Sequence, residues 1–347
     1  MSKLARLLGW IAVSFALALA GSAGAQTAPA AQQELIKQQQ QRRLEQPANN
    51  APVWREVRSG RSGSILVPGR EMGVLIQSSG QTWRALRDGP ITRYGGWLLV
   101  AVVILIAVFY LVRGAIKLHD KPTGRLIQRF GGFDRIAHWS TAITFCVMAI
   151  TGLIILFGKL VVLPVIGYTL FSWLAALSKN LHNFIGPLFI LSLIATIIAF
   201  IRDNLPTAAD VKWIARAGGM LGGREVPSGR FNAGEKGWFW IGVVILGIAM
   251  SVTGLIMLFP NFDQTRATMQ LANIVHGIGA ALFIALGLGH IYLGTIGVQG
   301  AYQAMRTGYV DETWAKEHHE LWYEDVKSGK VAAKSGGSAA GAAQAQH

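Results

Sequence analysis

The apolar residues of this chain are gathered into five long runs that are separated by charged loops. A helix needs about 20 residues to cross the hydrocarbon core of a bilayer, which is about 30 Å thick. Every run is long enough to do so, and the pattern therefore predicts an all-α integral membrane protein. The expected spans are about residues 95–113, 138–158, 181–201, 238–259 and 274–298.

A sixth apolar run, residues 160–177, follows the second expected span almost directly. It contains Pro164 and Gly167, and only Gly158 and Lys159 separate it from that span. No turn of this length comfortably reverses two spanning helices. We therefore expect this run to be a short interfacial helix or a re-entrant piece.

The N-terminus has the pattern of a secretory signal. A basic start precedes an apolar run at residues 7–20, and an A-x-A cleavage site ends at Ala25. We expect residues 1–25 to be a signal peptide, with an uncleaved anchor helix as the alternative. Residues 26–94 would then be an exported, periplasmic segment. Its first part, residues 26–60, is rich in Gln, Ala, Pro and Arg, which predicts a flexible arm.

The composition agrees with a membrane protein, since 52% of the residues are hydrophobic and only 14% are charged. The net charge of +14 raises the question of nucleic-acid binding. The Lys and Arg residues are, however, spread over the loops between the apolar runs, so we expect no nucleic-acid partner. The single cysteine, Cys146, lies within an apolar run and excludes a Cys-ligated iron–sulfur cluster within this chain.

Basic residues also predict the orientation of the spans. If the signal exports the N-terminus, five spans place the loops 113–135 and 202–237 and the C-terminal tail 301–347 in the cytoplasm. Those two loops are rich in Lys and Arg, whereas the opposite short loops carry only three such residues, namely Lys159, Lys179 and Arg266. This distribution is positive inside. The Gly/Ala/Ser-rich end of the tail is expected to be disordered.

Four of the eight histidines lie in or at the ends of the expected spans, where ionisable residues are costly and by default functional. Chain direction predicts their depth. His138 and His290 lie toward the cytoplasmic side, and His182 and His276 lie toward the exported side. His276 and His290 share one helix with a rise of about 21 Å between them, and they lie on nearly the same face.

Two histidine pairs at two depths match two stacked haems. Haem iron takes two axial ligands on opposite faces of its ring, and neutral imidazole suits iron. Topology pairs His138 with His290 and His182 with His276. We therefore predict a four-helix transmembrane dihaem bundle in residues 114–300, with the first span as one additional N-terminal helix.

Other interpretations of these histidines remain open. Each alone could be a polar tether between helices or a cap at the interface. A zinc or copper site is disfavoured, because the predicted pairs lie far apart and lack Cys or carboxylate partners. A transporter or assembly protein would place acidic residues beside them, but the interiors of spans two to five contain no Asp or Glu. We expect three further histidines to be solvated or to face a partner, namely His119, His318 and His319.

Six local runs after residue 125 carry a resemblance to a known family. They are RLIQRFGGFDRIAHW (125–139), NLHNFIGP (180–187), RFNAGEKGWFW (230–240), VHGIG (275–279), HIYLG (290–294) and WAKEHHELWY (314–323). In this order they resemble the gamma subunit of membrane-bound respiratory formate dehydrogenase, a cytochrome of the b556 type. The exported segment and the first span look like the longer form of this subunit.

The resemblance implies the haem ligands. His138 and His290 would ligate the haem b nearer the cytoplasm, and His182 and His276 would ligate the haem b nearer the exported side. This agrees with the pairing that the topology predicts.

The resemblance also implies a quinone pocket beside the cytoplasm-side haem. Asn232 and the backbone near Gly234 could hydrogen-bond a quinone oxygen, and His290 would line the pocket. The alternative for Asn232 is a helix N-cap, with Glu235 completing a capping box.

Partners follow from the same resemblance. An iron–sulfur beta subunit would dock on the exported face, and a molybdenum- or tungsten-containing alpha subunit would oxidise formate, which this chain alone is not expected to do. Electrons would enter at the exported-side haem and reduce menaquinone or ubiquinone from the cytoplasm-side haem, in the bacterial cytoplasmic (inner) membrane, during anaerobic respiration. A dihaem cytochrome serving another dehydrogenase, such as a nickel-iron hydrogenase, is the alternative, because substrate specificity would lie in the partner.

Overall fold

The computed structural model describes residues 30–45, 51–59, 79–216, 218, 226–331 and 335–336. The chain divides into two compact units, Met1–Ala85 with Leu255–Asn273 and Leu86–Gly254 with Ile274–His347. The expected signal peptide lies outside the described residues.

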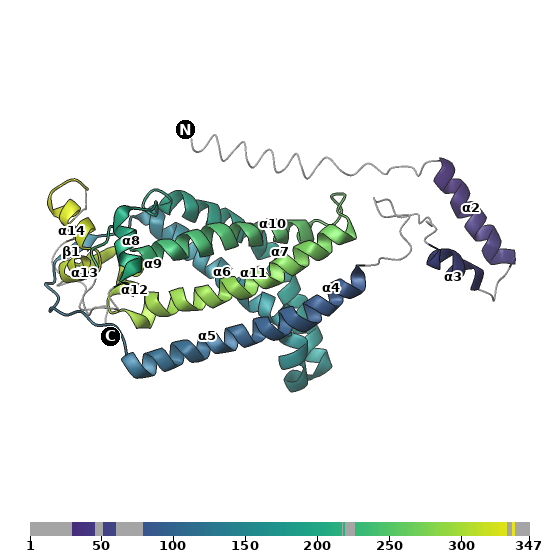
Figure 1. The fold of residues 1–347 in the computed structure, drawn as a ribbon, viewed down its shortest axis with the longest axis horizontal. Helices are drawn as coiled ribbons and strands as arrows, with labels where there is room; N and C mark the ends of the chain where they lie inside the picture. The colour runs from purple at the N-terminus through teal and green to yellow at the C-terminus, as the bar shows by residue number, and fades with distance from the viewer. Residues whose placement is uncertain are drawn as a thin grey trace. The chain divides into compact units, whose positions relative to one another are not determined.

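Within the described residues, five helices are long and apolar enough to cross a membrane (Figure 1). The predicted all-helical membrane fold is confirmed. The second and third helices are α6 (Gly132–Val161) and α7 (Leu163–Phe200). The others contain short π-helical segments: α4 (Gly80–Leu86), η1 (Arg87–Ile91) and α5 (Thr92–Arg113); α9 (Ala233–Gly237), η3 (Trp238–Leu246) and α10 (Gly247–Leu258); and α11 (Arg266–Tyr292) with η4 (Leu293–Gly297).

Helices α6 and α7 pack against each other along a hairpin. The apolar run 160–177 was expected to be a short interfacial helix or a re-entrant piece. In the structure it forms the end of α6 and the start of α7, with a turn residue at Val162 and a non-helical backbone at Gly167, where φ is 75°. A Cβ on Gly158 would lie 2.8 Å from the ring of Phe171, so the helices approach closely here. The 30 residues of α6 extend about 45 Å, which exceeds the hydrocarbon core. The chain reverses at Gly167, near the midpoint of the contacts between Thr151 and His182 and between Thr141 and Thr196. The reversal therefore lies beyond the core, where a tight turn is tolerated.

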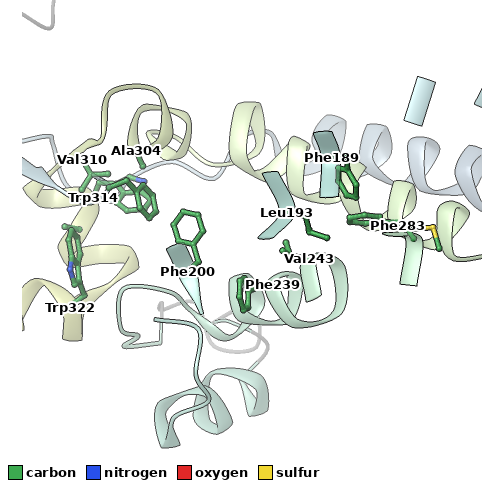
Figure 2. Close-up of a cluster of buried hydrophobic side chains, with 13 residues drawn as sticks. Phe189, Leu193, Phe200, Phe239, Val243, Phe283, Ala304, Val310, Trp314 and Trp322 are labelled. Atoms are coloured by element: carbon green, nitrogen blue, oxygen red, sulfur yellow. The ribbon is translucent and has the colours of Figure 1, made fainter. Parts of the chain in front are cut away.

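The buried core of the second unit has two parts (Figure 2). One part lies between the spans and contains Phe189, Leu193, Phe239, Val243 and Phe283. The other part gathers Phe200, Ala304, Val310, Trp314 and Trp322. Many large apolar side chains point outward instead, as on α5, where Leu105 is 67% exposed and Leu111 is 82% exposed. Contiguous apolar surface of this kind suits contact with lipid.

The segment after the fifth span is folded rather than an extended tail. It contains α12 (Ala301–Thr307), β2 (Tyr309–Asp311), α13 (Glu312–His318) and α14 (Glu320–Lys327). Strand β2 pairs antiparallel with β1 (Leu126–Gln128), which also pairs with β3 (Ser335–Gly336). Asp311 accepts hydrogen bonds from the backbone amides of Thr123 at 3.1 Å and Gly124 at 2.7 Å, which ties this segment to the loop before α6. Residues 337–347, whose disorder we predicted, lie outside the described residues.

The loop between the third and fourth spans and the N-terminal arm complete the description. Helix α8 (Ala208–Ala215) lies between α7 and α9. The arm predicted to be flexible contains, where it is described, α2 (Ala30–Glu45) and α3 (Ala51–Arg58). Arg42 and Glu56 form an ion pair of 2.6 Å between them. Gln, Ala and Arg have high helix propensity, which accounts for helix in a segment without a buried apolar face.

Candidate functional site

The four histidines singled out from the sequence come together as two pairs. His138 of α6 lies beside His290 of α11, with ring centres 6.1 Å apart. His182 of α7 lies beside His276 of α11, with ring centres 6.2 Å apart. Helix α11 therefore contributes one histidine to each pair.

This spacing fits an iron atom held between two imidazoles. A metal–imidazole bond is about 2 Å long and the ring centre lies about 1.2 Å behind the bonding nitrogen, so two axial imidazoles would have centres about 6.3 Å apart. Both observed separations agree with this value. Among the described residues, no group of three or more His, Cys, Asp or Glu side chains could hold a metal ion.

The His182–His276 pair is held by two buried threonines. The Nδ1 atom of His182 lies 2.8 Å from the hydroxyl of Thr151 on α6. The Nδ1 atom of His276 lies 2.9 Å from the hydroxyl of Thr253 on α10. Because these hydrogen bonds use Nδ1 in both rings, Nε2 is the nitrogen left for a metal.

The His138–His290 pair has different surroundings. The buried Nδ1 atom of His138 has no hydrogen-bond partner within the described residues. The ring of His290 is stacked on the indole of Trp238, with centres 4.8 Å apart and an interplanar angle of 12°. Aromatic packing rather than a hydroxyl therefore orients this histidine.

Asn232 forms the N-cap of α9 and completes a capping box. Its side-chain oxygen accepts a hydrogen bond from the backbone amide of Glu235 at 3.0 Å, and the Glu235 carboxylate accepts one from the backbone amide of Asn232 at 2.8 Å. A Cβ on Gly234 would lie 2.9 Å from the ring of Trp213, so glycine is required there for close packing. The cap fixes the amide of Asn232 with its oxygen engaged.

A buried cation lies next to this cap. The side chain of Arg129 is 4% exposed, although the sequence suggested only a loop charge. Its guanidinium donates to the Glu235 carboxylate at 3.0 Å and to the carbonyl of Arg230 at 2.7 Å. It also lies over the rings of Phe130 and Trp314, at 4.8 and 4.9 Å. Burial lowers the pKa of Arg129, and the Glu235 carboxylate opposes that shift.

His319 is buried, so the prediction that it is solvated or faces a partner is wrong. It is 1% exposed, and its Nδ1–H donates to the carbonyl of Gly229 at 2.8 Å. Its ring packs against that of Trp314. Burial and the nearby charge of Arg129 lower the pKa of His319 to about 3, and the imidazole is therefore neutral. His119, by contrast, is exposed.

All four paired histidines lie within residues 129–308, which match the family model of prokaryotic cytochrome b561. The chain belongs to this family. It is similar to the cytochrome b556(fdo) subunit of formate dehydrogenase from Escherichia coli (strain K12), at 30% identity over 210 residues, or 58% of this chain and 93% of that protein. The nitrate-inducible cytochrome b556(Fdn) subunit from the same organism is 27% identical over 218 residues, which cover 60% of this chain and 94% of that protein. The cytochrome b556 subunit of formate dehydrogenase from Haemophilus influenzae is 27% identical over 208 residues, or 57% of this chain and 82% of that protein.

Membership in a family of b-type cytochromes implies that the chain binds haem b, and the five apolar helices make it a multi-pass membrane protein. The residues of this cytochrome that the sequence interpretation missed are Thr151, Thr253, Trp238 and Arg129. Threonine in an apolar helix is common, because its hydroxyl bonds back to the preceding turn, and it carries no signal alone.

An internal repeat could have revealed the threonines. The run MAITGLIILF (148–157) recurs as MSVTGLIMLF (250–259), and each copy contains one of the two threonines. The next helix of each copy carries a histidine followed, after five residues, by Leu-Phe-Ile, at His182 and at His276. Helix pairs α6–α7 and α10–α11 are therefore related copies.

Proposed function

We propose that this chain is the membrane cytochrome b subunit of a formate dehydrogenase, which passes electrons from an iron–sulfur partner through two haems b to a membrane quinone. The observation that carries the proposal is the presence of two histidine pairs with ring centres 6.1 and 6.2 Å apart. The names of the similar proteins favour formate dehydrogenase over another dehydrogenase, such as a nickel-iron hydrogenase.

Each histidine pair would hold one haem iron by its Nε2 atoms. The haems would supply reversible one-electron exchange between ferric and ferrous iron. The protein holds the imidazoles in place, since Thr151 and Thr253 bond one pair and Trp238 packs on the other. The rigid helix α11 sets the separation of the two sites at about 21 Å along its axis, because His276 and His290 are both on it.

A quinone would bind at the His138–His290 end, beside Asn232 and Gly234. The capping box engages the side-chain oxygen of Asn232, and its amide NH₂ group is therefore the part that can donate a hydrogen bond to a quinone oxygen. His290 would line the same pocket. The N-cap and the quinone role use different atoms of Asn232, so they are compatible.

The charge distribution supports the orientation of the complex. The loops 113–135 and 202–237 and the segment 301–347 would lie in the cytoplasm, and residues 26–94 would lie on the exported side after signal cleavage. An iron–sulfur beta subunit and a molybdenum- or tungsten-containing alpha subunit would bind on the exported side. Protons for quinone reduction would come from the cytoplasm.

The deciding experiment counts haems. The purified chain is analysed by pyridine haemochrome assay and by a dithionite-reduced minus oxidised spectrum, together with His138→Ala, His182→Ala and His276→Ala variants. We expect two haems b in the unaltered chain and one in each variant, because a haem that loses an axial ligand is not retained.

The matched control is His119→Ala, because His119 is exposed and belongs to neither pair. It should keep both haems. If folded chain supplied with haem contained none, or if His182→Ala kept both, the dihaem proposal would be wrong. Formate-dependent reduction of the spectrum in the complex with its partner subunits would then test the substrate.

A further inference from the structure

We propose that Thr151 and Thr253 are positioning residues that set the tautomer and the basicity of His182 and His276, and thereby lower the reduction potential of the haem between them. This inference rests on the proposed ligation of haem by these two histidines. It concerns only residues on α6, α7, α10 and α11.

The direction of each hydrogen bond follows from the proton count. A threonine hydroxyl has one proton, and each hydroxyl here lies within hydrogen-bond distance of the carbonyl four residues earlier. The distances are 2.7 Å from Thr151 to Val147 and 2.6 Å from Thr253 to Ala249. A carbonyl can only accept, so the hydroxyl proton is donated to it, and a lone pair of the hydroxyl faces the histidine.

Consequently the histidine must donate through Nδ1–H. The hydroxyl oxygens lie 2.8 Å from Nδ1 of His182 and 2.9 Å from Nδ1 of His276. A neutral imidazole with its proton on Nδ1 has a lone pair on Nε2, which is the state that binds iron. The opposite tautomer would accept the hydroxyl proton at Nδ1 and carry its own proton on Nε2, which would leave no lone pair there for iron.

The internal repeat is independent support for this role. Thr151 and Thr253 occupy the same position in the two copies, and each contacts the histidine of its own copy. Both threonines are buried, at 5% and 8% exposure. The glycine after each one lets the histidine approach, since a Cβ on Gly152 would lie 3.3 Å from Cε1 of His182 and one on Gly254 would lie 3.6 Å from Cε1 of His276.

The effect on the haem follows from ligand basicity. An acceptor on Nδ1–H makes Nε2 a stronger donor. A stronger donor stabilises ferric iron, which carries more positive charge than ferrous iron, and so lowers the reduction potential. His138 has no such acceptor within the described residues, and the other haem should lack this effect on that side.

The test measures the midpoint potential of each haem in the purified, haem-loaded chain with Thr151→Val, Thr253→Val and both together. Valine keeps the shape of threonine and removes the hydroxyl. Redox titration of the α-band should give a more positive midpoint for one haem in each single variant, and a larger positive shift in the double variant. The second haem, identified as the one lost in His138→Ala, should not shift.

Two control variants separate hydrogen bonding from packing. Thr151→Ser restores a hydroxyl and should restore the midpoint. Thr144→Val removes a threonine of α6 that bonds back to Ser140 at 2.7 Å and contacts Ser192 of α7 at 3.1 Å but contacts no histidine, and it should leave both midpoints unchanged.

The inference is overturned if the valine variants keep their midpoints, or if Thr144→Val shifts them equally. A valine variant could also lose one haem altogether. In that case, the hydroxyl role is supported if Thr151→Ser and Thr144→Val both keep that haem. The role is overturned if Thr151→Ser loses it as well. Failure of the ligation itself is distinguished by His182→Ala, which would then keep both haems whatever the threonine variants do.

Discussion

The two histidine pairs differ in how the repeated helices supply them. His182 and His276 occupy equivalent positions in the two copies, and each contacts an equivalent threonine. The pair of His138 and His290 does not follow the repeat. By the offset of the repeat, His138 corresponds to Trp240 of η3, and His290 corresponds to Thr196 of α7.

The two non-histidine equivalents have structural contacts instead. The indole N–H of Trp240 donates to the carbonyl of Asn204 at 2.8 Å, and the hydroxyl of Thr196 donates to the carbonyl of Ala137 at 3.0 Å. At the His182–His276 end, the two copies of the repeat therefore provide equivalent surroundings for the two histidines. At the His138–His290 end, the two copies differ. Under the proposed function, the asymmetric end, with a stacked indole and a buried charge nearby, is the one at which the quinone would be reduced, and the symmetric end would only transfer electrons.

Among the variants at the His138–His290 end, Glu235→Gln is expected to reduce the stability of the chain most. Glutamine can still accept the capping hydrogen bond but leaves Arg129 as a buried cation without a carboxylate partner. Because the Glu235 side chain is 36% exposed, the cost should lie between about 1 kcal/mol, as for an exposed pair, and about 3 kcal/mol, as for a buried pair. The thermal stability of the purified chain should fall, and the haem of the His138–His290 pair should be released first on heating.

Arg125→Gln provides the comparison for that variant. Arg125 also pairs with a glutamate, Glu312, but its side chain is 74% exposed. Exposed pairs contribute about 1 kcal/mol or less. Equal losses of stability in the two variants would contradict the importance of the buried cation.

Acid should destabilise the His138–His290 end, near which His319 is buried, before it destabilises the His182–His276 end. His319 has a pKa of about 3 in the folded chain and about 6.5 when unfolded. Above pH 6.5 it is neutral in both states. As the pH falls from 6.5 toward 3, the unfolded chain binds a proton that the folded chain does not, so the folded state loses stability across this window.

Hydrogen–deuterium exchange, corrected for the intrinsic rate, measures this loss. Exchange in α13 and α14 should increase between pH 7 and pH 5, while exchange around His182 should not. His319→Asn can still donate to the carbonyl of Gly229 and does not titrate, so it should remove the pH dependence. Unchanged exchange in the unaltered chain would refute the prediction.

The smallest effect is expected for Trp238→Leu, which removes the stacked indole from His290. A stacked aromatic pair contributes about 0.5–1.5 kcal/mol beyond its buried area. Haem content should be kept, and the low-temperature α-band of one haem should change. Trp173→Leu changes an indole that is 75% exposed and should leave both bands unaltered; a change in the band of the His182–His276 haem in Trp238→Leu would contradict the comparison.

The membrane fold and the histidine pairs were predictable for a common reason. Apolar runs of spanning length and histidines within them are both rare in soluble chains, so each carries strong information. The helix lengths did not follow from hydropathy, because α6 and α7 continue past the hydrocarbon core. The ligation of haem and the quinone contacts of Asn232, Gly234 and His290 stay predictions.

The folded segment after the fifth span was not predictable from local pattern. Its strands β2 and β3 have only three and two residues, and β2 pairs with residues some 180 positions earlier in the chain. The burial of Arg129 and His319 depends on the same long-range contacts. A charged or polar side chain in a loop gives no local sign of burial, so His319 was predicted to be solvated or to face a partner, and Arg129 was counted only as a basic residue of its loop.

The β1–β2 ladder also has a consequence for the order of synthesis. Strand β1 directly precedes α6 and β2 follows α11, so the ladder connects the ends of the two helices that carry His138 and His290. Trp139 adds a hydrogen bond from α6 to the carbonyl of Met305 at 3.1 Å. The contact of Trp139 requires Met305, and the complete ladder requires Asp311, so neither can form before the ribosome has translated all five spans. The helix ends that carry His138 and His290 are therefore joined only after every span of the nascent chain has been made.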